Sequence, residues 1–212
     1  MNEKFFDLKK EKQDRMINAA LKVFALNGYR HASTDEIVRE AAISKGLLFH
    51  YFENKLGVYA FVYDYSVRYL LLELSTAVDA KETDLFTLMQ QVETGKMHAM
   101  CGYPYLQPFL NRAQAENVNE ALVAVEERKQ QMEEAYENIY ARADLGKYAA
   151  AEDVVKLRKM MELTIKGLMN ERILEDAFQP EMLYEEILEY LQLSRRLAER
   201  SGQPSDEEIT EK

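Results

Sequence analysis

Cysteine is nearly absent from this chain: Cys101 is the single one among 212 residues, so no disulfide can form within it. The three histidines, His31, His50 and His98, follow no spacing that metal sites use. We therefore expect no metal and no cofactor. A chain without disulfides suits a reducing compartment, which favours the cytoplasm.

Long apolar runs are missing as well. The most apolar region, residues 57–78, is interrupted by Asp64, Arg68 and Glu73, whereas a membrane-spanning helix needs about 20 predominantly apolar residues. The charged N-terminal residues have no apolar block of the kind that marks a signal peptide. We expect no membrane anchor.

The composition is that of a folded protein, with 47% hydrophobic residues, eight Gly and four Pro. The net charge of −10 is unevenly distributed: residues 1–57 hold ten Lys/Arg and eight Asp/Glu, so the remainder carries about −12. A mildly basic N-terminal part on an acidic remainder would orient the molecule on a polyanion.

Helical periodicity dominates, and no alternating pattern predicts a strand. We expect helices at residues 9–26, 34–41, 44–52, 54–78, 84–100, 104–114, 119–143, 151–174 and 180–199. Asn27-Gly28 is a typical left-handed stop for the first of them. Residues 201–212 are polar, and we expect them to be disordered.

The second and third helices are short and are joined by a tight turn. Ser33, followed by Glu36, predicts a capping box for the second helix, and Ser44 can cap the third. Only Ala42 and Ile43 remain between the two helices. This arrangement is the helix-turn-helix pattern.

The third helix has an inner and an outer side. Leu48 and Phe52, at i and i+4, can point inward together. The outward side chains, Lys45, Leu47, His50 and Tyr51, offer an amine, an apolar group and hydrogen-bond donors suited to bases and phosphates. Gly46 lets the backbone approach a groove closely. Lys45 and Lys55 each lie in a first helical turn, where an external phosphate would favour a cation.

These residues resemble a known family. Ala19 to Val62, AALKVFALNGYRHASTDEIVREAAISKGLLFHYFENKLGVYAFV, is similar to the DNA-binding domain of TetR-family transcriptional regulators. Two positions depart from the family pattern: Ala42 stands where Gly is usual, and Phe49 where Tyr is frequent. An Ala at positive φ would cost roughly 1 kcal/mol.

The resemblance implies an all-α chain with an N-terminal three-helix helix-turn-helix domain, residues 1–54, here called the head. Residues 55–200, the body, would form a larger helical domain for ligand binding and dimerisation. The resemblance further implies that Lys45, Gly46 and Leu47 face base edges and that Thr34, His50, Tyr51 and Lys55 contact phosphates. It favours a homodimeric, ligand-responsive repressor that binds a palindromic double-stranded DNA operator.

Apolar stripes in the last two helices are compatible with such a dimer. The predicted interface residues are Leu157, Met161, Ile165, Leu168, Ile187 and Leu191. The middle of the body is rich in Met and aromatic residues, which line pockets for small, largely apolar effectors but also fill ordinary cores. The predicted pocket residues are Tyr65, Met97, Met100, Tyr103, Phe109 and Tyr136. An effector would act on the head through the long helix that starts near Asn54.

Two other functions are compatible with the sequence. A Cys101–His98 pair could serve catalysis, but the spacing supplies no third orienting residue, so we expect no enzyme. Alternatively, the chain could be a helical scaffold that acts through protein partners without binding DNA. Steep salt dependence of DNA binding would distinguish a regulator from a scaffold.

Overall fold

The computed structural model describes residues 3–148, 150–174 and 178–200, and over these ranges the chain forms helices and no strand. The all-α prediction is confirmed. The α-helices are α1 (Lys10–His31), α2 (Thr34–Glu40), α3 (Lys45–Phe52), α4 (Lys55–Ala77), α5 (Leu85–Gly102), α6 (Leu106–Gln114), α7 (Asn119–Tyr140), α8 (Ala151–Arg172) and α9 (Pro180–Arg200). Short 3-10 helices occupy Glu3–Phe5 and Leu145–Lys147. The predicted disorder of residues 201–212 concerns a segment outside the described residues.

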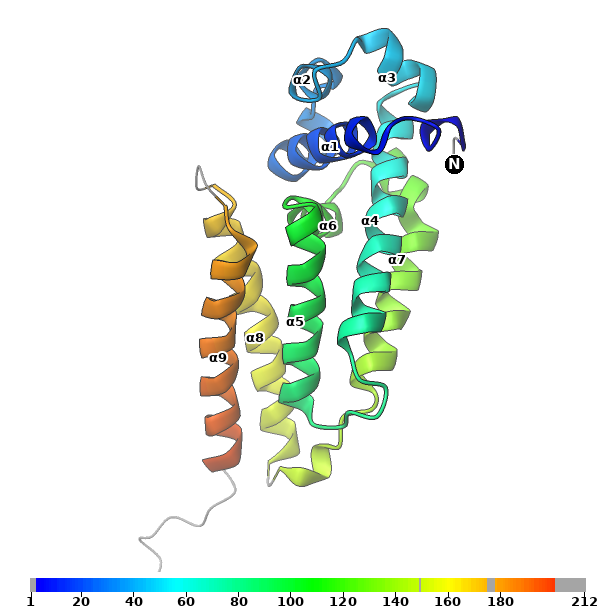
Figure 1. Cartoon of the computed structure of the whole chain (residues 1–212). Helices are drawn as coiled ribbons and strands as arrows, with labels where there is room; N and C mark the ends of the chain where they lie inside the picture. Colours follow the sequence, from blue (N-terminus) through cyan, green and yellow to red (C-terminus); the bar gives the residue numbers. More distant parts are fainter. Residues whose placement is uncertain (1–2, 149, 175–177, 201–212) are drawn as a thin grey trace, which may run out of the picture.

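Helices α1, α2 and α3 lie together at one end of the molecule (Figure 1). Helix α4 starts in this end and runs the length of the body beside α7, while α8 and α9 form the opposite side next to α5. Helix α6 lies between α1 and the long helices. The head therefore caps one end of an elongated helical body.

Side-chain caps begin α2, α3 and α4, as the sequence predicts for Ser33 and Ser44. The Ser44 hydroxyl accepts a hydrogen bond from the Leu47 backbone N–H at 3.2 Å, and Asn54 Oδ1 accepts one from Gly57 N–H at 2.8 Å. Ser33 caps α2 through the Asp35 N–H at 3.2 Å instead of the Glu36 N–H that the predicted capping box requires. In α1 the predicted stop appears as a break at Gly28, whose φ of 67° and ψ of 174° are not helical.

The turn between α2 and α3 places Ala42 at a φ of 51°. This left-handed conformation is the one that family members usually satisfy with Gly, so the chain keeps the turn with a residue that strains it. The Ala42 N–H still bonds to the Arg39 carbonyl and Ile43 N–H to the Val38 carbonyl.

The hydrophobic core is continuous between head and body. Phe24 of α1 packs edge-on against Tyr59 of α4, with ring centroids 5.0 Å apart, and lies 6.1 Å from Phe109 of α6. A second cluster joins α5, α8 and α9 around Met89, Ile165 and similar side chains. Because these side chains are closely packed, a movement of α4 or α6 would displace side chains of the head. Within the described part of the chain, no helix is both long and apolar enough to span a bilayer.

Candidate DNA-binding surface and ligand cavity

The outer side of α3 is open. Lys45, Gly46 and His50 are exposed, and a Cβ placed on Gly46 would meet no atom within 4 Å. Leu48 and Phe52 are buried beneath them, as their spacing predicts. The short helix therefore presents a low, polar surface above an apolar base.

The two lysines differ in their surroundings. Lys45 Nζ lies 2.7 Å from Asp35 and its side chain stays half exposed. Lys55 Nζ instead lies 4.6 Å from the centre of the Tyr29 ring and donates to the Arg30 carbonyl. Desolvation lowers the pKa of Lys55, against the opposing effect of nearby glutamates. Lys45 is thus the more accessible of the two lysines for a phosphate, because its partner Asp35 is itself exposed.

The remaining predicted DNA contacts lie at the edge of this surface. Thr34 is half-buried at the first position of α2, and Leu47 is half-buried in α3. Tyr51 packs edge-on against Phe5 at 5.8 Å, which ties the N-terminal segment beneath α3. Phe5 is fully buried although it stands in a charged segment, whose composition gives no sign of a core residue.

Phe49 also has a defined place. It is half-buried, and the Lys45 ammonium lies 6.0 Å from its ring centre. The ring thus supports the Lys45 side chain through a cation–π contact rather than offering a hydroxyl to the surface.

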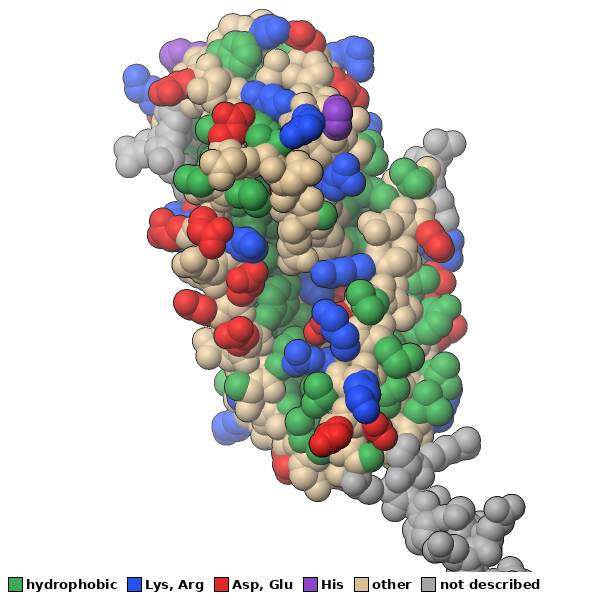
Figure 2. Space-filling model, turned by 180° about the vertical axis from the view of Figure 1, so that it is seen from behind, with side chains coloured by type: hydrophobic (Ala, Val, Ile, Leu, Met, Phe, Trp, Pro, Cys, Tyr) green, Lys and Arg blue, Asp and Glu red, His purple; other side chains and the backbone are tan. Residues whose placement is uncertain are grey.

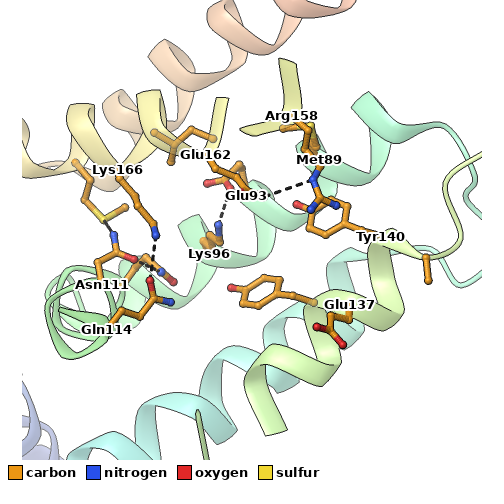
Figure 3. A pocket seen from close by; sticks show the side chains of 15 residues that line it. Met89, Glu93, Lys96, Asn111, Gln114, Glu137, Tyr140, Arg158, Glu162 and Lys166 are labelled. Carbon is orange, nitrogen blue, oxygen red and sulfur yellow. Dashed lines mark hydrogen bonds and ion pairs between the residues drawn. The ribbon is translucent and has the colours of Figure 1, made fainter. Parts of the chain in front are cut away.

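A cavity of about 470 Å³ opens in the body between α5, α6, α7 and α8. This volume lies in the range of small-molecule sites, about 300–1,000 Å³. The lining combines apolar with charged side chains, several of which converge in Figure 3. They are Met89, Glu93, Lys96, Gln107, Asn111, Gln114, Tyr136, Glu137, Tyr140, Ala141, Arg158, Glu162, Ile165, Lys166 and Met169.

An ion pair lies in this cavity. Lys96 Nζ is 2.7 Å from Glu93 Oε1, and the two side chains are only 16% and 6% exposed. Burial alone would lower the pKa of Lys96, but the charge of Glu93 outweighs it and raises that pKa, so the ammonium stays charged. The same ammonium lies 5.5 Å from the Tyr136 ring centre. Lys96 is therefore fixed by the protein itself.

Of the six predicted pocket residues, Tyr136 alone lines this cavity. Phe109 and Met100 are buried in the two cores, and the Met97 sulfur contacts Cys101. Tyr103 is buried too: its hydroxyl donates to Asp14 at 2.6 Å and shares a hydrogen bond of the same length with Tyr65. Richness in aromatic residues and Met therefore marks the core of the body. The cavity is lined mainly by polar side chains, which that criterion does not find.

The predicted dimer residues lie toward the interior of this chain. Met161, Ile165, Ile187 and Leu191 are buried inside this chain's own body, because α8 and α9 turn that stripe toward α5 and toward each other. Leu157 and Leu168 are half-buried against the same cluster. The outward faces of α8 and α9 carry a different exposed apolar set: Val155, Met160, Leu163, Met182, Tyr190, Leu193 and Leu197. Hydrophobic side chains are visible along the outward face of α8 and α9, at the right of Figure 2.

Cys101 and His98 make separate contacts. Cys101 Sγ is 3.3 Å from Glu181 Oε1, whereas His98 Nδ1 is 3.9 Å from Glu73. Partial desolvation of this exposed thiol and the neighbouring Glu181 carboxylate raise the pKa of Cys101 to about 11, which disfavours the nucleophilic thiolate. Among the described residues, no group of three or more His, Cys, Asp or Glu side chains is arranged to hold a metal ion.

These features define a class: helical proteins with an N-terminal helix-turn-helix and a helical body. Residues 16–60 match the family described as bacterial regulatory proteins, tetR family. The N-terminal segment therefore belongs to the TetR family, and the whole chain has the fold of TetR-family transcriptional regulators.

Two curated relatives share this segment. The chain is 37% identical over 78 residues to an uncharacterized HTH-type transcriptional regulator, YuxN of Bacillus subtilis, covering 35% of this chain and 26% of that protein. It is 41% identical over 49 residues to another, TtgW of Pseudomonas putida, covering 23% of this chain and 37% of that protein. The matches thus span from about a quarter to somewhat over a third of these relatives.

Solved structures show the likeness of the whole fold. A TetR family transcriptional regulator from Chloroflexus aurantiacus superposes with a TM-score of 0.55 at 23% identity, covering 94% of this chain and 93% of that one. The fatty acid degradation regulator FadR from Bacillus halodurans gives a TM-score of 0.51 at 17% identity, covering 84% and 96%. At these identities the likeness concerns the fold alone.

Proposed function

We propose that the chain is a cytoplasmic transcriptional repressor that binds a palindromic operator as a homodimer and leaves it when a small molecule enters the body. The open face of α3 above a buried apolar base is the observation that carries the DNA-binding part. Lys45, Gly46 and Leu47 read base edges, while Thr34, His50, Tyr51 and Lys55 hold phosphates.

The homodimer is proposed to form through the exposed apolar faces of α8 and α9. Exposed apolar side chains on two adjacent helices favour a four-helix bundle with a second copy. Leu163→Glu with Leu193→Glu should separate the dimer in sedimentation analysis. Leu72→Glu, at an equally exposed apolar position on α4, is the matched control and should leave it intact.

The cavity is proposed as the effector site because α6 joins it to the head. Gln107 and Asn111 of α6 line the cavity, while Phe109 of the same helix contacts Phe24 and lies 5.5 Å from Tyr59. A ligand that shifts α6 would change the distance between the two heads of the dimer. A changed distance alters the affinity for the operator. The long helix α4 shares this core and would move with it.

The first test is enrichment of genomic DNA fragments by purified protein, followed by binding to the enriched operator at several salt concentrations. Lys45→Ala removes one cation from each of the two heads, so it should weaken binding and reduce the slope of log K against log salt by up to about 2. Lys81→Ala, at an exposed position in the loop at the far end of the body, is the control and should change neither value (Figure 1).

The alternative scaffold function makes the opposite prediction. If no fragment is enriched as the salt concentration is lowered, the head does not read DNA, and partner proteins become the better account. Enrichment that is independent of sequence would also contradict an operator-specific repressor.

A further inference from the structure

Two side chains that line the cavity each carry a buried polar atom without the partner that buried groups normally have. Gln107 is 6% exposed, and its Oε1 has no hydrogen-bond partner among the described residues. The Tyr136 hydroxyl oxygen is likewise buried and unpartnered. Both residues line the cavity. Since buried polar groups are nearly always hydrogen-bonded, each atom calls for a ligand group.

The neighbours of Gln107 fix which of its amide atoms is free. Asn111 Nδ2 lies 3.2 Å from the Met169 sulfur, and a thioether can only accept. Asn111 therefore turns its carbonyl oxygen to Gln107, which donates to it from Nε2 at 2.9 Å. Gln107 Oε1 is left buried and without a partner at the cavity wall, and an amide oxygen only accepts hydrogen bonds. The ligand must bring a hydrogen-bond donor.

The charges that line the cavity sum to zero, with Glu93, Glu137 and Glu162 against Lys96, Arg158 and Lys166. Lys96 pairs with Glu93 at 2.7 Å and Arg158 with Glu162 at 3.5 Å, as the dashed lines of Figure 3 mark. Lys166, at an exposed position, donates to the Gln114 amide oxygen. A charged group placed beside Lys96 would have to break the buried Lys96–Glu93 pair and leave one partner uncompensated, which is costly in a buried site.

The cavity also has an apolar portion. Met89, Ile165 and Met169 line it and are buried. A ligand that only offers hydrogen bonds would leave this surface uncovered, and a hydrocarbon would leave Gln107 and Tyr136 unpartnered. The lining is therefore complementary to a molecule that has both an apolar part and a hydrogen-bonding group.

We propose that the cavity binds an uncharged amphipathic molecule, an apolar skeleton bearing a hydroxyl or N–H group that donates to Gln107 Oε1 and a group that pairs with the Tyr136 hydroxyl. This inference rests on the proposed role of the cavity as effector site, and it replaces a largely apolar effector with one that must carry a donor.

The test uses two apolar skeletons, naphthalene and butylbenzene, each bearing a hydroxyl, a methyl, a carboxylate or an aminomethyl group. Binding to the full chain is measured by calorimetry. The hydroxyl compounds should bind at least tenfold more tightly than their methyl and charged counterparts. Preference for a charged member, equal binding of the hydroxyl and methyl members, or no binding at all would overturn the proposal.

Two variants locate the effect. Tyr136→Phe and Gln107→Leu should each reduce the preference for hydroxyl over methyl to about twofold, whereas Gln130→Leu, on α7 outside the cavity, should leave it unchanged. Tyr136→Phe loses no hydrogen bond, so the melting temperature of its free form should not fall, which separates weak binding from misfolding.

DNA binding is measured on the same samples, so that the two proposals fail separately. Specific operator binding without hydroxyl preference overturns the ligand class alone. Hydroxyl preference without any operator binding overturns the repressor function and leaves the ligand class in place.

Discussion

The strained turn between α2 and α3 predicts that Ala42→Gly makes the protein more stable. At a φ of 51° an L-residue is disfavoured by about 1–2 kcal/mol, and Gly removes that cost. Ala42 is exposed, so its methyl group contributes little burial. Gly adds freedom to the unfolded chain and so costs about 0.4–1 kcal/mol. The net gain should be close to about 0.8 kcal/mol, or a rise in melting temperature of about 2–3 °C for a chain of this size.

The neighbouring residue supplies the control. Ala41 has a φ of −76° and is fully buried, so Ala41→Gly relieves no strain, loses a buried methyl group worth about 0.8 kcal/mol and adds unfolded-state freedom. It should destabilise the chain by roughly 1.5 kcal/mol. Scanning calorimetry of both variants decides the matter. A fall in melting temperature for Ala42→Gly, or equal shifts for the two variants, would show that the turn is not strained.

Three further outcomes follow from close contacts. Gly57→Ala places a Cβ 2.0 Å from the Phe52 carbonyl oxygen, so urea unfolding should show a loss of about 1–3 kcal/mol. Tyr103→Phe leaves the partners of its hydroxyl unsatisfied and should lower the free energy of unfolding by about 1–3 kcal/mol in the same assay. Tyr136→Phe has no hydrogen bond to lose and should not lower it. Equal losses for the two variants would contradict these hydrogen-bond assignments. Cys101, with a thiol pKa of about 11, should react with iodoacetamide at pH 8 about tenfold more slowly than an ordinary thiol, because its scarcity of thiolate outweighs its higher intrinsic nucleophilicity. Unusually rapid alkylation would revive a nucleophilic role.

Local features of the structure could be predicted from the sequence. The cap at Ser44, the break at Gly28 and the positive φ at Ala42 depend on neighbours within a few positions, and helix periodicity is equally local. The helix-turn-helix was therefore predictable nearly residue by residue.

The cavity and the outer face of the body were not predictable in this way. Glu93 and Lys96, at i and i+3 on α5, look in the sequence like an ordinary solvated pair. Only the packing of α6, α7 and α8 buries them. Similarly, a regular apolar stripe identifies the side of α8 and α9 that enters the chain's own core, while the exposed set beside it breaks the periodicity and resembles scatter.

Gly46 separates the demands of the fold from those of DNA binding. It has ordinary helical surroundings and open space where a Cβ would stand, so Gly46→Ala should stabilise α3, by up to about 1 kcal/mol. If the α3 backbone must approach base edges, the same methyl group should weaken operator binding. A variant that melts higher and binds DNA less would mean that the glycine serves recognition at the expense of stability. A variant that melts higher and binds as well would place the DNA away from this turn of α3, and the proposed base contacts of Lys45 and Leu47 would fall with it.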